Sequence, residues 1–87
     1  MDRVRRSGNV AHRVVEGQAV IVLPQSGEII VLNETGAAVW NLLDGEHDLQ
    51  DIVQELTGKF EVTPSAAQRD VENLYRQLID AGVAQPV

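Results

Sequence analysis

The sequence predicts a small α+β domain in which a three-stranded antiparallel sheet is followed by three helices. Two observations carry this prediction. Apolar runs separated by short turns containing Gly or Pro fill residues 10–32, and apolar residues at helical spacing fill residues 35–82. The chain has 87 residues, of which 44% are hydrophobic and 23% are charged, so it has room for one core. We expect a flexible segment over residues 1–8 and a single domain over residues 9–87.

The strands are expected at residues 10–16, 19–23 and 28–32. Gly17-Gln18 supplies the first turn, and the Pro and Gly of residues 24–27 supply the second. The run 19–23 is the only one without a charge, which suits a middle strand with a partner on each side. Together the three runs predict an antiparallel meander.

The first two helices follow from their caps and apolar spacing. Asn33 or Thr35 is the expected N-cap of the first helix, which ends at Asp44-Gly45. The second helix is expected to begin at Asp48 and to end near Gly58. Its apolar residues recur at i, i+3, i+4 and i+7 and form one stripe, namely Leu49, Ile52, Val53 and Leu56.

The third helix is expected to open at Thr63-Pro64, because Pro at the first helical position after a Thr cap is pre-set for helix entry, and to close at Gly82. Residues 83–84 add a short strand or simply pack against the core. The last two helices can form a helix-turn-helix, so the arrangement is winged-helix-like.

The sequence offers little for catalysis or metal binding. It has no Cys and no Gly-rich phosphate loop, and His12 and His47 have no closely spaced ligand partner. The acidic residues between the first two helices are better explained as helix caps than as cation ligands, and Trp40 as a core residue. We therefore expect no enzyme activity, no metal and no cofactor.

DNA binding is the alternative that the helix-turn-helix pattern raises. The net charge is −6, from 7 basic and 13 acidic residues. The polar faces of the third helix carry Arg69 and Arg76 against Asp70, Glu72 and Asp80. Recognition of a phosphate backbone needs clustered Lys and Arg, so a winged-helix transcription regulator is the second hypothesis and no nucleic-acid partner is expected.

The third strand is the feature that favours a binding function. It is an edge of the meander, and the run Ile29, Ile30, Val31, Leu32 has no charge beyond Glu28 to guard it. Such an edge can pair with an incoming extended peptide. Alternatively, residues 83–84, the N-terminal segment or a second copy of the chain covers it.

Several residues resemble a known family. They are Leu32-Asn33-Glu34-Thr35-Gly36-Ala37-Ala38-Val39-Trp40-Asn41-Leu42-Leu43-Asp44-Gly45, then Ile52-Val53, Asp70-Val71, Leu78 and Ala81-Gly82. This pattern resembles the PqqD family, which comprises the pyrroloquinoline quinone biosynthesis protein D and related precursor-peptide recognition elements, including those for lasso peptides. The resemblance covers residues 10–83.

The resemblance implies a winged helix-turn-helix that does not bind DNA and instead acts as an adaptor for a ribosomally synthesised, modified peptide. A leader peptide would pair with the third strand and lie against the third helix. Carried onto this chain, the peptide-binding residues would be Glu28, Ile29, Ile30, Val31 and Leu32 on the strand, and Ala67, Asp70, Asn73, Leu74 and Gln77 on the helix. The partner enzyme would be a radical SAM enzyme, or a leader peptidase or cyclase.

The remaining expectations concern location and assembly. The longest apolar runs are far shorter than the roughly 20 residues that a membrane-spanning helix needs, and no apolar stretch follows the charged N-terminus. We expect a cytoplasmic protein that does not bind membranes and is a monomer or a weak homodimer.

Overall fold

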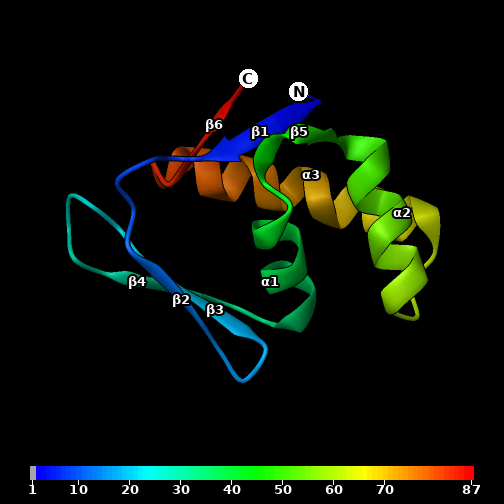
Figure 1. Cartoon of the computed structure of the whole chain (residues 1–87), viewed down its shortest axis with the longest axis horizontal. Helices are drawn as coiled ribbons and strands as arrows, with labels where there is room; N and C mark the ends of the chain where they lie inside the picture. Colours follow the sequence, from blue (N-terminus) through cyan, green and yellow to red (C-terminus); the bar gives the residue numbers. More distant parts are fainter. Residues whose placement is uncertain (1) are drawn as a thin grey trace.

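The structure is a computed structural model that describes residues 2–87. Its elements in chain order are β1 (Arg3–Arg6), β2 (His12–Val15), β3 (Gln18–Val22), β4 (Ile29–Leu32), α1 (Glu34–Asn41), β5 (Asp44–Asp48), α2 (Leu49–Lys59), α3 (Pro64–Asp80) and β6 (Ala84–Pro86). The strands form two separate sheets, ordered β2-β3-β4 and β5-β1-β6 (Figure 1). The α+β class is confirmed.

The β2-β3-β4 sheet is the predicted antiparallel meander. The first turn lies one residue earlier than the predicted Gly17-Gln18, because Gln18 already belongs to β3 and pairs with Val15. It consists of Glu16 and Gly17, both with positive φ (51° and 80°), as a two-residue hairpin loop of type I′ requires. Alternation along β3 separates the two faces of the sheet. Ala19 and Ile21 are fully buried and face α1, while Val20 lies on the outer face and remains partly exposed.

The second sheet corrects the expected order of one sheet followed by three helices. Residues 1–8 were predicted to be flexible, but Arg3–Arg6 forms β1, whose residue Val4 is fully buried. Both of its neighbours come from distant parts of the chain, because Arg3 pairs with Asp48 of β5 and Val4 with Pro86 of β6. Burial of Val4 and pairing on both sides therefore hold β1 in place.

All three helices begin at predicted N-caps. The side chains of Asn33, Asp48 and Thr63 accept hydrogen bonds from backbone N–H groups in the first turns of α1, α2 and α3. Asp48 and Asp51 form a reciprocal capping box, which confirms the capping role expected for this acidic segment. Each cap stabilises its helix by about 1 kcal/mol.

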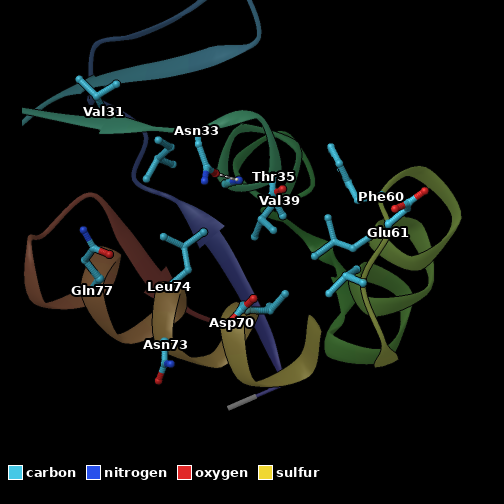
Figure 2. A pocket seen from close by; sticks show the side chains of 15 residues that line it. Val31, Asn33, Thr35, Val39, Phe60, Glu61, Asp70, Asn73, Leu74 and Gln77 are labelled. Atoms are coloured by element: carbon cyan, nitrogen blue, oxygen red, sulfur yellow. Dashed lines mark hydrogen bonds between the residues drawn. The ribbon is translucent and has the colours of Figure 1, made fainter. Parts of the chain in front are cut away.

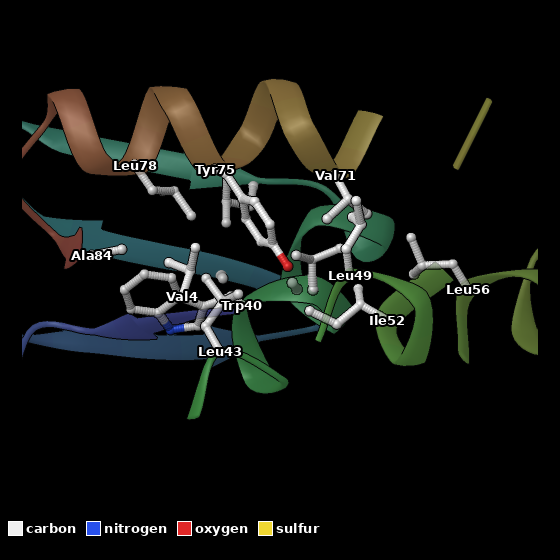
Figure 3. Packing of buried hydrophobic residues seen from close by; sticks show 14 of the residues in the cluster. Val4, Trp40, Leu43, Leu49, Ile52, Leu56, Val71, Tyr75, Leu78 and Ala84 are labelled. Atoms are coloured by element: carbon white, nitrogen blue, oxygen red, sulfur yellow. The ribbon is translucent and has the colours of Figure 1, made fainter. Parts of the chain in front are cut away.

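The core lies between the three helices and the two sheets. Trp40 is fully buried, as predicted, and Figure 3 shows it packed with Val4, Leu43 and Leu78. Tyr75 is also buried, but its hydroxyl group has no hydrogen-bond partner among residues 2–87. Burial accordingly raises the pKa of Tyr75 to about 12.

Trp40 also links the two sheets through its polar groups. Arg6 of β1 donates to the Trp40 carbonyl oxygen at 2.8 Å, and the indole N–H of Trp40 donates to Nδ1 of His12 at 3.2 Å. His12 therefore connects β2 to α1 through this hydrogen bond. Among the described residues, no helix has both the length and the apolar character needed to cross a lipid bilayer.

Candidate functional site

A cleft of about 640 Å³ lies between β4, α1, the end of α2 and α3 (Figure 2). In Figure 2 β4 and the start of α1 form one wall, and α3 forms the opposite wall. The lining residues are Val31, Leu32, Asn33, Thr35, Gly36, Val39, Leu56, Phe60, Glu61, Val62, Asp70, Val71, Asn73, Leu74 and Gln77. A hollow of this size, lined by aliphatic and a few polar groups beside a sheet edge, suits an extended peptide.

The direct junction between β4 and α1 shapes one wall. Asn33 follows the last residue of β4 and caps α1, because its Oδ1 accepts from the Gly36 N–H at 2.9 Å. A Cβ atom at Gly36 would lie only 3.0 Å from the Cβ of Leu32. Glycine at this position therefore lets the first turn of α1 approach β4 closely, and both elements face the same cleft.

In β4, two residues have backbone N–H and C=O groups that do not pair with β3 and are open to a ligand at this edge. The Leu23 N–H donates to the Glu28 carbonyl toward β4, whereas the Val22 N–H donates to Ala11 on the opposite side. Hydrogen-bonded residues alternate along an antiparallel pair, so Ile30 and Leu32 use their backbone groups to pair with β3. The N–H and C=O groups of Ile29 and Val31 consequently point to the open edge.

The predicted peptide-binding residues occupy three different environments. Six of them line the cleft, namely Val31, Leu32, Asp70, Asn73, Leu74 and Gln77, although Val31 does so only at the strand edge, because its side chain lies on the outer face of the sheet with that of Val20. Glu28, Ile29 and Ile30 belong to the hairpin but lie outside the cleft lining. Ala67 is 1% exposed and packs in the core, so it does not reach the cleft surface.

The exposed flank of α3 provides the other wall. Figure 2 shows Leu74 pointing from α3 toward β4, with Gln77 and Asp70 on either side of it, whereas Asn73 points away. Leu74 is half-buried and packs against the core. It can therefore present an apolar surface to a ligand at the middle of the cleft.

Sequence reasoning missed the part of the cleft formed by α1 and the end of α2. Val39, Leu56 and Val62 contribute its apolar surface there, together with the half-buried Phe60. The direct Leu32-Asn33 junction was a signal for the α1 wall, because a helix that starts at once after a strand must lie beside its end. The α2 contribution depends on tertiary packing alone.

The charges at the cleft are negative. Glu61 and Asp70 are both exposed, and the lining contains no Lys, Arg or His. Arg69 lies 4.0 Å from Asp70, but both side chains are more than half exposed and interact weakly. Arg76 donates to the Asn73 Oδ1 at 2.9 Å beside the lining. The cleft therefore favours a ligand that brings a positive charge to the Asp70 end.

Asp44 and His47 form the other notable pair of titratable groups. The Asp44 carboxylate accepts from His47 Nδ1 at 2.9 Å and from the backbone N–H groups of Glu46 and His47. The hydrogen bond between the two side chains lowers the pKa of Asp44 and raises that of His47. Residues 2–87 contain no group of three or more His, Cys, Asp or Glu side chains placed to hold a metal ion.

Comparison with known proteins relates residues 18–84 to the family of coenzyme PQQ synthesis protein D (PqqD). Over 63 residues the chain is 36% identical to the PqqA binding protein of Methylococcus capsulatus. The aligned region covers 72% of this chain and 63% of that protein, so the chain spans slightly less than two thirds of this relative.

Two solved structures share the fold. One is a lasso peptide synthetase B1 complexed with the leader peptide, with 30% identity and a TM-score of 0.83, covering 97% of this chain and 99% of the other. The second is the PqqD truncation of Methylobacterium extorquens PqqCD, a stand-alone recognition element for ribosomally synthesised and modified peptides. It has 23% identity and a TM-score of 0.76, and covers 94% of this chain and 87% of the other.

Proposed function

The chain belongs to the PqqD family, and on this basis we propose that it is a non-catalytic adaptor that binds the leader region of a precursor peptide. The precursor belongs to the biosynthesis of a ribosomally synthesised, modified peptide or of pyrroloquinoline quinone. The adaptor presents it to a modifying enzyme, either a radical SAM enzyme or a leader peptidase or cyclase. The relatives that bind PqqA or a leader peptide support this proposal.

The observation that carries the proposal is the open edge of β4 above the cleft. Ile29 and Val31 offer unpaired N–H and C=O groups along this edge, and α3 places Leu74 opposite it. An extended peptide can satisfy the backbone groups by adding a strand, while its inward side chains contact the cleft. Backbone pairing gives affinity with little dependence on sequence, and the cleft adds selectivity.

The proposed binding residues are those that line the cleft or carry the free backbone groups. Ile29, Val31 and Leu74 are central, and Asp70 and Gln77 lie on either side of Leu74. Glu28 contributes only through its position at the start of the hairpin, because its carbonyl oxygen already accepts from Leu23. Ala67 supports α3 from within the core.

Three further features remain proposals. We assign α2 and α3 to the helix-turn-helix of a winged-helix-like arrangement, with the β2-β3-β4 sheet as the wing. The protein acts as a monomer or weak homodimer, without enzymatic activity of its own. Its location in the cytoplasm stays a prediction from the sequence.

The alternative of a winged-helix transcription regulator has no support from the relatives described above. The exposed faces of α3 also carry more acidic than basic side chains, which disfavours contact with phosphate groups. It remains useful as the competing outcome of a binding experiment.

Fluorescence anisotropy tests the proposal directly. Labelled leader peptides of candidate precursors are titrated with the purified protein, and a labelled DNA duplex is titrated in parallel at low salt. We expect saturable binding of one leader peptide and no binding of the duplex. Binding of the duplex alone would contradict the proposed function.

A further inference from the structure

We propose that the outer face of the β2-β3-β4 sheet takes part in peptide selection, with Ile29 and Val31 favouring aliphatic side chains at two peptide positions that are two residues apart. This inference rests on the proposed function and specifies the class of peptide that the site binds. The ligand is an extended segment that is apolar on both faces, rather than on the cleft face alone.

Four aliphatic side chains form a block on the outer face. Val20 pairs with Val31 and Val22 pairs with Ile29, and residues directly opposite in an antiparallel pair lie on the same face. Their neighbours along β3, Ala19 and Ile21, are buried on the inner face. The block therefore lies on the side of the sheet that is turned away from α1.

Exposure within this block increases toward the open edge. Val20 and Val22 are only partly exposed, because strands lie on both sides of β3. Ile29 and Val31 are 59% and 53% exposed, because no strand of the described chain lies beyond β4. A strand added to β4 would supply the missing neighbours of these two side chains.

The backbone geometry determines which peptide residues make these contacts. Ile29 and Val31 carry the free N–H and C=O groups, so the peptide residues that pair with them lie directly opposite. Side chains of directly opposite residues share a face, and those of the two peptide residues therefore lie beside Ile29 and Val31. The peptide residue between them points inward, toward the side of the cleft that holds Leu74.

The peptide is the occupant that this geometry favours. The apolar block runs without interruption into the edge where the peptide is proposed to pair, so one strand covers both. At the other edge of the same face, β2 carries Arg13 opposite Val20, and Val15 opposite the polar Gln18. A second copy of the chain or a partner enzyme on this face is a competing outcome that the experiment separates.

The test uses a library of random twelve-residue peptides displayed on mRNA, selected against the purified protein. One selected peptide is then scanned with threonine, and its affinity is measured for the wild type and for the double variant Ile29→Thr/Val31→Thr. Threonine keeps the β-branched shape and the strand preference, but its hydroxyl replaces a methyl group of valine or the ethyl group of isoleucine. Each single variant is measured as well, and Val15→Thr is the matched control, because Val15 is 45% exposed on the same face at the far edge.

We expect the double variant to bind the peptide about tenfold more weakly, because the free energies of two cross-strand contacts add. Val15→Thr should bind the peptide like the wild type. Threonine at two peptide positions, i and i+2, should weaken binding to the wild type by about threefold each but have no further effect in the double variant. Circular dichroism confirms that the variants are folded.

Three results would overturn the inference. The first is that threonine substitutions in the peptide lower its affinity equally for the wild type and for the double variant. The second is a change in sedimentation mass of the double variant with unchanged peptide affinity, which would assign the face to a second copy of the chain. The third is a library that yields no binding peptide, in which case the proposed function itself fails.

Discussion

Replacing Val31 with proline tests whether a bound peptide pairs with β4, because it removes a single hydrogen-bond donor, the Val31 N–H. The Val31 N–H points to the open edge of β4, so Val31→Pro removes a donor that a bound peptide would use, while the pairing of Ile30 and Leu32 with β3 remains. Proline is tolerated on edge strands in this orientation, so the variant should stay folded. The peptide loses one hydrogen bond and keeps a carbonyl group without a partner at the interface. These two effects together cost about 2 kcal/mol, which corresponds to about 30-fold weaker binding.

The assay is an anisotropy titration of a bound leader peptide with each variant. Val14→Pro is the matched control, because the same alternation points the Val14 N–H to the opposite open edge, on β2. Val31→Thr, which keeps the N–H group, separates the loss of the donor from the loss of the side chain. A folded Val31→Pro variant with wild-type affinity would refute pairing of the leader with β4.

Three further predictions concern other side chains. Tyr75→Phe should raise the free energy of unfolding in urea by about 1 kcal/mol, because it removes a buried hydroxyl group without a partner; a loss of stability would show that the hydroxyl is bonded. The His47–Asp44 pair stabilises the folded state above the ordinary Asp pKa of 3.8 and below the ordinary His pKa of 6.5. The difference in Tm between wild type and His47→Gln should therefore be largest near about pH 5 and disappear as pH rises through the elevated His47 pKa, whereas a constant difference would contradict the pairing. Asp70→Asn should weaken binding of a lysine-containing peptide about twofold at low salt and not at high salt; an equal effect at both would exclude an electrostatic role.

Local signals in the sequence were sufficient to predict about half of the fold, namely the three helices and the β2-β3-β4 sheet. The caps Asn33, Asp48 and Thr63 were correct because each acts within its own first turn. The three strands of the meander were correct because short turns join them and their apolar runs stand out.

The second sheet depends on contacts that are distant in sequence. β1 is rich in arginine and β5 reads Asp-Gly-Glu-His-Asp, so neither resembles a strand by composition. Both are strands because Val4 is buried and because Arg3 pairs with Asp48, about half the chain away. Pairing between such distant segments leaves no periodic pattern in either one.

The candidate site likewise consists of residues that local spacing predicts and residues that depend on tertiary packing. Helical spacing placed Asp70, Leu74 and Gln77 on one flank of α3, and all three line the cleft. Ala67 has the same spacing but packs into the core. The contributions of Val39 and Phe60 arise from how α1 and α2 pack, which spacing along α3 cannot indicate.

Amide hydrogen exchange, measured by NMR with and without a saturating leader peptide, tests strand addition at β4 most directly. In the free protein, the amides of Ile30 and Leu32 should exchange slowly because they pair with β3, and those of Ile29 and Val31 should exchange fast. Bound peptide should slow exchange at Ile29 and Val31. Saturable binding that leaves these two amides exchanging as fast as before would contradict strand addition at this edge.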